Sequence, residues 1–334
     1  MRRIQDNNPS ALLGARKALS SLSILLWLVV LGLVFAVLTP DFLTGPNLLN
    51  VAKQSSVYGI VAIGMTFVII TGGIDLSVGS LISFCGAVLG VVWQQTENIF
   101  VAGLACLAAG LLAGLISGLL VGRAGLPPFI ATFGMMGVGA GLAFVLAPTT
   151  IGGFPRGFDF LGSGHIGGVP VPAILMLVLG LIAQYFLSRT RFGLRVLAIG
   201  GNEQSARLTG VDIARYKTLV YVISGLLCGL GALVLCARLR SAYPGAGQGY
   251  ELNVIAATVI GGIDLMGGRG SVIGAIAGAL LIGVIQNGLN LLGVAPFMQQ
   301  IATGLLIVIA VLANQARGGQ IWQRLRKQAS LSRA

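Results

Sequence analysis

Ten stretches of predominantly apolar residues recur along this chain, each about as long as a helix must be to cross a lipid bilayer. A membrane-spanning helix needs about 20 apolar residues, and only helices or closed barrels satisfy every backbone polar group inside a membrane. Only 9% of the 334 residues are charged, whereas soluble domains carry about 25%. The sequence therefore predicts an all-α polytopic membrane protein with about ten transmembrane helices, some of them discontinuous. The predicted spans are residues 20–38, 50–71, 77–94, 99–122, 128–147, 171–188, 217–237, 252–267, 271–292 and 297–314.

The positive charges indicate how these spans are oriented. An even number of spans puts both termini on one side, and placing both in the cytoplasm puts all but four of the 21 Lys and Arg residues there. The four exceptions are Lys53, Arg156, Arg238 and Arg240. Because this asymmetry follows the positive-inside rule, we expect both termini to be cytoplasmic. The net charge of +12 then reflects topology and contact with lipid headgroups, and nucleic acid is not an expected partner.

Three regions follow from this topology. A basic cytoplasmic N-terminus covers residues 1–19, a transmembrane domain covers 20–314, and a basic cytoplasmic tail covers 315–334. The polar segment 189–217 is predicted to be cytoplasmic, and the Gly- and Pro-rich loop 148–170 is predicted to lie outside the cell membrane.

Several kinds of chemistry have no signature in this chain. The four cysteines lie within apolar runs and the only histidine, His165, lies in a loop, so neither a metal site nor a disulfide is predicted. No GxxxxGK[ST] phosphate-binding loop occurs, and no chain of intramembrane acids could relay protons. We expect no catalytic residue and no cofactor on this chain. A transporter of this kind is a passive channel, a sodium-coupled carrier or a subunit driven by a partner.

Glycines at four-residue spacing predict close helix packing. Small residues at this spacing let transmembrane helices approach each other. The spacing occurs at Gly110, Gly114, Gly118 and Gly122, at Gly225 and Gly229, and at Gly274 and Gly278. Packing within one chain accounts for most of this pattern, and a subunit interface remains an alternative.

The polar segment between residues 200 and 217 predicts a short, capped helix. Asn202 can cap a helix whose first turn carries Glu203, and Gly210 can end that helix after about two turns. Asp212 can then cap the long apolar run that follows. So short a helix is not stable alone in water and must lie against something else. A short helix held at the cytoplasmic surface between two spans suits the transmission of force from a soluble partner.

The pentapeptide Gly-Gly-Ile-Asp-Leu occurs twice, at residues 72–76 and 261–265, and places Asp75 and Asp264 next to apolar spans. An intramembrane acid costs roughly 2.5–3.5 kcal/mol and needs compensation. For Asp75, capping of the next helix and a role in a pathway or gate both remain open. For Asp264 capping is favoured, with Arg269 as a neutralising partner. An intramembrane aspartyl protease is a remote alternative, because isoleucine precedes both acids instead of the glycine and tyrosine of such enzymes.

Three amide side chains interrupt the ninth apolar run, at Gln286, Asn287 and Asn290. They predict either hydrogen bonds between helices or a neutral wall that accepts hydroxyl groups.

Four segments of the chain resemble the ribose-type permease subunits of ATP-binding cassette importers. These segments are residues 64–80, 200–210, 249–262 and 287–294, and the resemblance extends from about residue 40 to 314. It implies a homodimer in the cell inner membrane, with a cytoplasmic ATP-binding subunit that holds ATP and Mg²⁺ and a periplasmic sugar-binding protein. Ribose is the leading substrate. A stand-alone secondary carrier or channel for a small neutral solute is the alternative.

The resemblance also implies roles for particular residues. The ATPase-coupling residues are expected to be Gly201, Asn202, Glu203, Ser205, Ala206, Arg207, Leu208, Gly210 and Asp212. Asp75, Ser77, Asn287 and Asn290 are candidates for the pathway or gate, and Arg238 and Arg240 are candidates for docking the binding protein. The sequence departs from the family at Asp264, where relatives usually have a small hydroxyl residue, so a shared role for the two acids is weakened.

Overall fold

The computed structural model of the chain describes Ile24 and residues 26–317, and it is a bundle of helices. Seven helices are long and apolar enough to cross a membrane. They are α2 (Gly45–Ile70), α3 (Val78–Thr96), α4 (Ile99–Gly122), α5 (Pro128–Leu146), α7 (Val171–Arg189), α10 (Ile213–Leu239) and α12 (Val272–Leu291). Shorter apolar helices occupy three further predicted spans: Leu26–Leu38, α11 (Tyr250–Ile260) and the first part of α13 (Pro296–Arg317). The predicted polytopic all-α class is confirmed.

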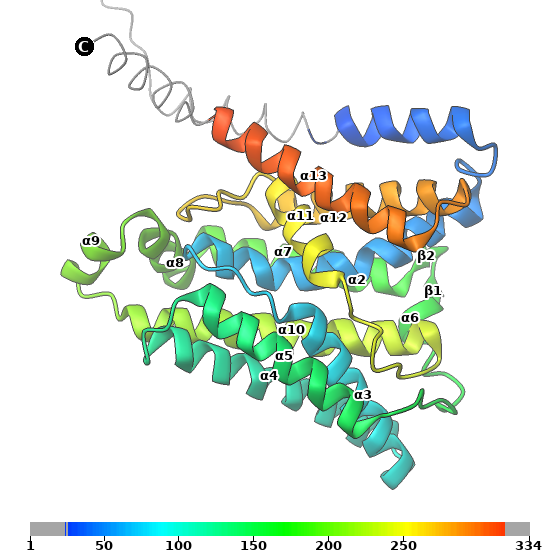
Figure 1. The fold of residues 1–334 in the computed structure, drawn as a ribbon, viewed down its shortest axis with the longest axis horizontal. Helices are drawn as coiled ribbons and strands as arrows, with labels where there is room; N and C mark the ends of the chain where they lie inside the picture. The colour runs from blue at the N-terminus through cyan, green and yellow to red at the C-terminus, as the bar shows by residue number, and fades with distance from the viewer. Residues whose placement is uncertain (1–23, 25, 318–334) are drawn as a thin grey trace, which may run out of the picture.

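The long helices run roughly side by side, and the short elements gather at the two ends of the bundle (Figure 1). Helices α8 (Arg191–Gly201) and α9 (Glu203–Leu208) project at one end. Helix α6 (Phe160–Ser163) and the hairpin of β1 (His165–Ile166) and β2 (Val169–Pro170) lie at the other. Because α8 and this small hairpin lie in segments that the sequence analysis treats as loops, neither was predicted.

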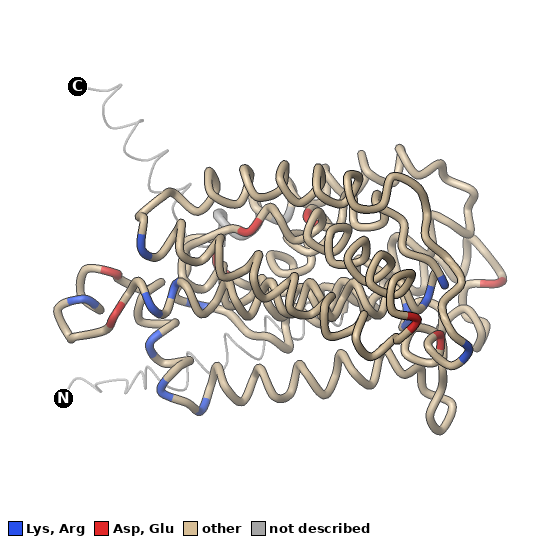
Figure 2. Tube along the Cα trace, turned by 90° about the horizontal axis from the view of Figure 1, so that it is seen from below, with Lys and Arg blue, Asp and Glu red and all other residues tan. Residues whose placement is uncertain are grey.

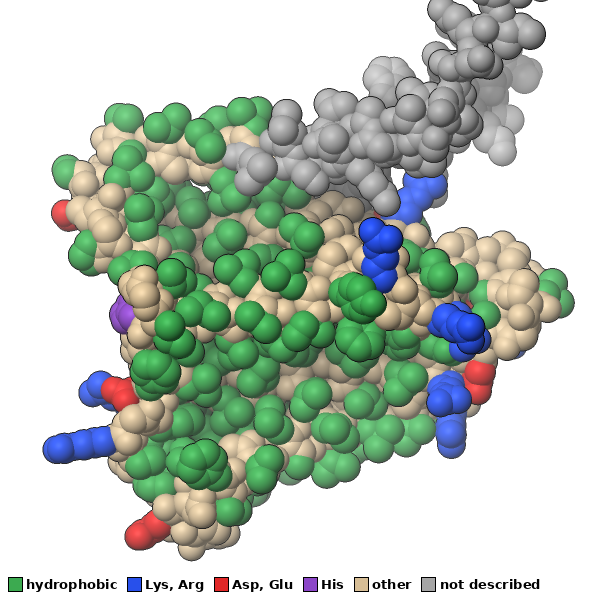
Figure 3. All heavy atoms as spheres, turned by 180° about the vertical axis from the view of Figure 1, so that it is seen from behind, with side chains coloured by type: hydrophobic (Ala, Val, Ile, Leu, Met, Phe, Trp, Pro, Cys, Tyr) green, Lys and Arg blue, Asp and Glu red, His purple; other side chains and the backbone are tan. Residues whose placement is uncertain are grey.

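Helix α2 lies at the centre of the bundle. Every residue from Ser55 to Ile70 is buried, and the helix contacts α7, α10, α11 and α12. The outer faces of α4, α5 and α7 instead carry exposed leucines, isoleucines and phenylalanines. Figure 3 shows apolar side chains across the middle of one surface and charged side chains at its two edges. A surface of this kind matches a lipid bilayer with polar regions on both sides.

The glycine stripe of α4 packs against α10 of the same chain, as predicted. A methyl group on Gly114 would lie 2.4 Å from the Tyr221 carbonyl oxygen, and one on Gly110 would lie 2.3 Å from that of Gly225. Methyl groups on Gly118 and Gly122 would lie 2.7 and 2.5 Å from backbone carbonyl oxygens of α10. In the same way Gly278 of α12 meets the backbone of α11 at Ala257. These contacts place backbone against backbone, which only glycine allows.

Two helices begin inside the bundle instead of at its surface. After α2 ends, residues 71–77 return into the bundle before α3 begins, and Asp75 reaches Ser224 near the middle of α10. The Gly247 amide donates a hydrogen bond to Ser83 Oγ of α3 (3.0 Å) just before α11 begins. The starts of α3 and α11 therefore meet within the protein. Irregular backbone of this kind is compatible with a membrane interior, because protein buries it.

Candidate functional site

The short helix α9 has the capped structure that the sequence predicts. Asn202 Oδ1 accepts a hydrogen bond from the Ser205 amide at 2.8 Å, so Asn202 is the N-cap. The helix ends at Leu208, and Gly210 follows with a φ of +80°, a conformation that favours glycine. Asp212 Oδ1 then accepts the Arg215 amide at 3.0 Å and caps α10.

One buried side chain holds α9 to its neighbours. Ala206 packs with Ile199 of α8 and Ile213 of α10, and these three residues form a small core of their own. The rest of the helix faces outward, and the side chain of Leu208 is 85% exposed. The predicted need for a support is met by α8 and α10.

Glu203 ties the base of α9 to α10. Its carboxylate accepts hydrogen bonds from Lys217 Nζ at 2.7 Å and from Arg207 Nη2 at 3.1 Å. The nearby Lys217 ammonium, with a smaller contribution from Arg207, holds the pKa of Glu203 below its usual value. Because the Glu203 side chain is 40% exposed, solvent screens these pairs and their contribution to stability is small.

A cavity of about 640 Å³ lies beside α9, between the α4–α5 connection and the start of α10. Pro127 and Pro128 line one side, and Glu203, Arg207 and Lys217 line the other. The cavity therefore presents apolar and charged groups together at the end of the molecule where α9 projects.

The end of α8 is in backbone contact with the end of α2. The Gly268 amide donates a hydrogen bond to the Ile70 carbonyl oxygen at 2.8 Å. A methyl group on Gly200 would lie 1.7 Å from that oxygen and 2.3 Å from the Gly268 nitrogen. We name Ile70, Gly200, Gly267 and Gly268 the glycine junction. At this junction α8 and α2 meet backbone against backbone.

Asp75 lies at the far end of the segment that follows this junction. Its side chain is buried, with Oδ1 accepting both the amide (3.0 Å) and the hydroxyl (2.5 Å) of Ser77. Oδ2 accepts the Ser224 hydroxyl of α10 at 3.0 Å. Among the described residues no cation pairs with Asp75, so hydroxyl and amide donors supply its compensation. Asp75 thus stabilises the start of α3 and also joins it to α10.

Asp264 has a different environment from Asp75. It lies in the 261–271 connection, where Oδ1 accepts the Met266 amide at 3.0 Å. The α12 N-cap is Ser271, supported by Gln184 of α7, so the expectation that Asp264 caps the next helix is wrong. Arg269 meets Asp264 through its backbone carbonyl, and no ion pair joins their side chains in the described part of the chain. The two aspartates share no hydrogen bond there, which does not support the protease alternative.

The amides of α12 have unequal surroundings. Asn287 is 3% exposed and exchanges two hydrogen bonds of 2.9 Å with Asn47 of α2. Asn290 is exposed and lies 3.5 Å from Gln299 Nε2. Gln286 accepts hydrogen bonds from Tyr58 and Gln54. The sequence analysis did not connect these residues to Gln286, since more than 200 positions separate them from it.

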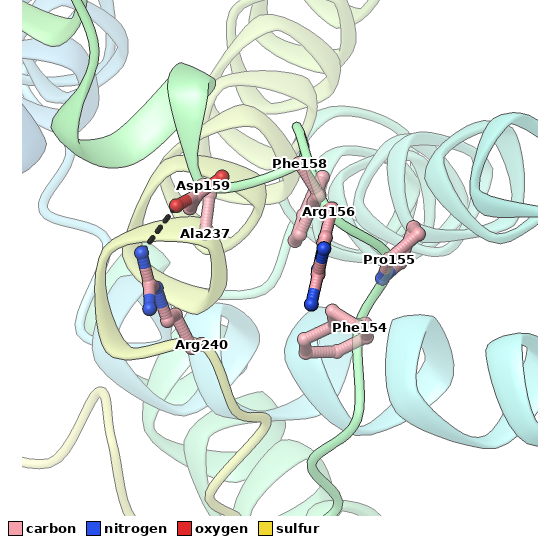
Figure 4. Close-up of a pocket in the computed structure, with 7 residues that line it drawn as sticks. All are labelled: Phe154, Pro155, Arg156, Phe158, Asp159, Ala237 and Arg240. Atoms are coloured by element: carbon pink, nitrogen blue, oxygen red, sulfur yellow. Dashed lines mark hydrogen bonds and ion pairs between the residues drawn. The ribbon is translucent and has the colours of Figure 1, made fainter.

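The candidate docking arginines also differ from each other (Figure 4). Arg240 ends α10 and forms an ion pair with Asp159 at the rim of a cavity of about 410 Å³. Arg156 lines the same cavity beside Phe154 and has no ion-pair partner among the described residues. Arg238, by contrast, lies close to Tyr58 and Tyr250. The exposed cationic pair at this end is therefore Arg156 and Arg240, and Arg156 was not among the predicted docking residues.

Most charged residues lie toward the ends of the bundle (Figure 2). The end that carries α9 has most of the described cations: Arg123, Arg189, Arg191, Arg195, Arg207, Arg215, Lys217 and Arg269. Across residues 24 and 26–317 no cluster of three His, Cys, Asp or Glu side chains could hold a metal ion, and all four cysteines are buried.

Known proteins match this chain over most of its length. Residues 47–311 match the family described as branched-chain amino acid transport system / permease component. The ribose import permease protein RbsC of Bacillus subtilis is 42% identical over 295 residues, which cover 87% of this chain and 92% of the relative. RbsC of Escherichia coli K12 is 42% identical over 299 residues, which cover 88% of this chain and 93% of the relative. The L-arabinose transport system permease protein AraH of the same strain is 36% identical over 292 residues, covering 86% and 89%. No solved structure matches the chain.

Proposed function

The chain belongs to the branched-chain amino acid transport system / permease component family, and we propose that it is the membrane-spanning subunit of an ATP-driven monosaccharide importer. The observation that carries this proposal is the capped, exposed helix α9, joined through the glycine junction to the buried helix α2. The ribose and arabinose permeases among its relatives support a pentose as the substrate, with ribose first.

The chain crosses the inner membrane ten times with both termini in the cytoplasm. Seven helices have spanning length, and the three shorter apolar helices occupy the remaining predicted spans. The end that carries α9 is the cytoplasmic end. The concentration of Arg and Lys residues around α8 and α9 supports this orientation.

A cytoplasmic ATP-binding subunit docks on α9, and ATP and Mg²⁺ bind to that partner. Leu208 and Arg207 face outward and are available for this contact. The cavity beside α9, with Pro127, Pro128 and Lys217 in its lining, offers room for a side chain of the partner. Closure of the ATP-binding subunits pushes α9 and α8 against Ile70, and α2 passes this movement to the segment that holds Asp75.

Two copies of the chain form the transport unit, and the sugar moves along the seam between them. A periplasmic sugar-binding protein delivers the substrate at the opposite end. Its acidic side chains contact Arg240 and Arg156 at the rim of the cavity in Figure 4. Arg238 was the other predicted docking residue, but its place beside Tyr58 and Tyr250 makes Arg156 the better partner for Arg240.

Reconstitution tests this function directly. The purified chain is placed in proteoliposomes with the ATP-binding subunit and the sugar-binding protein from its own operon, and uptake of radiolabelled ribose, arabinose and a hexose is measured. We expect uptake that requires ATP and both partners. Uptake by the chain alone would instead establish a stand-alone carrier or channel. A complete assembly that hydrolyses ATP but moves no sugar would contradict the substrate class.

A further inference from the structure

Uncharged amide side chains gather in one sector of the bundle. Helices α4, α5 and α10 contain neither Asn nor Gln. The neighbouring helices α2, α11 and α12 and the start of α13 contain Asn47, Asn50, Gln54, Asn253, Gln286, Asn287, Asn290, Gln299 and Gln300. Amides are costly against lipid, so nine in one sector indicate a surface that faces protein or a polar solute.

Three of these amides and one tyrosine form a continuous hydrogen-bond network. Gln286 Oε1 accepts from the Tyr58 hydroxyl at 2.6 Å and from Gln54 Nε2 at 3.3 Å. Gln286 Nε2 donates to Asn253 Oδ1 at 2.8 Å. The network therefore joins α2, α12 and the discontinuous helix α11. It lies in the half of the bundle opposite α9, since α2 begins and α12 ends there.

The network does not use all the hydrogen-bonding capacity of its members. A carboxamide can donate two hydrogen bonds and accept two. Among the described residues, Gln54 uses one donor, and the second N–H of Gln286 has no partner. Both side chains are only partly buried. These groups therefore remain able to bind a solute that both donates and accepts.

Aromatic rings lie directly beside these amides. The Tyr58 and Tyr250 ring centroids are 4.7 Å apart, and both rings are at least nine-tenths buried. Arg238 lies close to both phenol groups. Aromatic faces next to amides suit a sugar ring, because its C–H bonds pack on the aromatic face while its hydroxyl groups pair with the amides.

We propose that Gln54, Tyr58, Tyr250, Asn253 and Gln286 form a low-affinity subsite for one neutral monosaccharide as it crosses the membrane. This inference rests on the proposed function, which supplies the sugar. A neutral sugar fits better than a cation, because the network contains no acidic side chain. It also fits better than an anion, because Arg238 is the one cationic side chain described beside the network. The subsite gives this chain a selectivity of its own, separate from that of the sugar-binding protein.

The test uses the full chain in lipid nanodiscs without its partners, with D-ribose as the probe. Saturation-transfer NMR measures binding to the native chain and to the Tyr58→Phe and Gln286→Leu variants. Tyr185→Phe is the matched control, because this tyrosine of α7 is exposed on the outer surface. We expect saturation transfer from the protein to ribose with the native chain and with the Tyr185→Phe control. The affinity for ribose should be about three- to tenfold weaker in Tyr58→Phe and in Gln286→Leu.

A structural role for the network would give a different result. If the native chain shows no transfer to ribose, or if both variants bind as the native chain does, the subsite is refuted. Should Gln286→Leu fail to fold, Tyr58→Phe decides alone, since it removes one oxygen atom. ATP-driven uptake by the native assembly is measured in parallel. Uptake without binding to the nanodiscs refutes only the subsite, whereas no uptake refutes the proposed function.

Discussion

The amide of Gly268 donates a hydrogen bond to the carbonyl oxygen of Ile70 at 2.8 Å, so the 261–271 connection is fastened to the last residue of α2. Gly200 of α8 lies against both groups. Three segments far apart in the sequence thus meet through backbone atoms alone. A contact of this kind transmits displacement with little loss, because there is no flexible side chain to absorb it.

Gly200→Ala is expected to uncouple the chain from its ATP-binding partner. The added methyl group has no room beside the Ile70 carbonyl, so α8 must shift, at a cost of about 1–3 kcal/mol. Gly134→Ala in α5 is the control, since nothing lies within 4 Å of a methyl group there. The measurement is sugar uptake per ATP hydrolysed in proteoliposomes. Equal ratios for the two variants would show that the junction carries no movement.

Leu208→Glu is expected to release the ATP-binding subunit without unfolding the chain. The Leu208 side chain is 85% exposed, so its replacement leaves the bundle intact but places a charge in the proposed interface. Leu208→Met should restore binding because it returns an apolar surface. Pull-down of the ATP-binding subunit measures the effect, and thermal unfolding of each variant reports on the fold. Full recovery of the partner with Leu208→Glu would place the contact elsewhere.

Reversing the charges of Glu203 and Arg207 together tests the same interface while retaining their mutual attraction. The pair of Glu203 with Lys217 is lost in this variant, so Lys217→Met serves as the control for that contact. We expect ATP hydrolysis to continue with reduced uptake, or the ATP-binding subunit to be lost from the complex. Normal pull-down together with normal transport would refute the coupling role of α9.

Acidification is expected to loosen α9. The pKa of Glu203 is lowered in the folded chain, chiefly by Lys217. Its contribution to stability is therefore present above the usual pKa of about 4.3 and is lost as pH falls through the lower folded value. Hydrogen exchange of the α9 amides between pH 5 and 3, corrected for intrinsic rates, should show reduced protection. Lys217→Met should weaken this pH dependence, and an unchanged profile would contradict the assignment.

Asp75→Ala is expected to destabilise the start of α3. The substitution leaves the hydroxyl groups of Ser77 and Ser224 without their acceptor, which costs about 1–3 kcal/mol. A double-mutant cycle with Ser224→Ala, followed by thermal unfolding, isolates the contact between α3 and α10. If the changes in unfolding free energy of the two single variants add up to that of the double variant, the two side chains do not interact. Uptake measured on the same variants shows whether the contact also serves the gate.

Charge reversal of Arg156 and Arg240 is expected to weaken docking of the sugar-binding protein. Both residues line the cavity at the end opposite α9, and the Arg240 side chain is 75% exposed. The loss should be greatest at low salt, because ions screen exposed charges. Glu97→Lys, at the end of α3, controls for a general change of surface charge. Unchanged affinity at low ionic strength would exclude this cavity from the docking surface.

The sequence alone determined the membrane-spanning character, the capped helix between Asn202 and Gly210 and the backbone packing of the α4 glycines. Each of these depends on forces that act over a few residues: the length of an apolar run, a cap that bonds three residues ahead, or a four-residue stripe. Helix α8 was not predicted, although Phe192, Val196 and Ile199 give this segment an apolar face at helical spacing.

Only the tertiary structure decided which distant residues meet. Nothing near Gly200 in the sequence indicates the Ile70 carbonyl, and nothing near Tyr58 indicates Gln286. Likewise, two identical pentapeptides give a buried Asp75 and a partly exposed Asp264. The physical reason is that such contacts depend on how whole helices pack, and packing is set by the complementary surfaces of all their neighbours together.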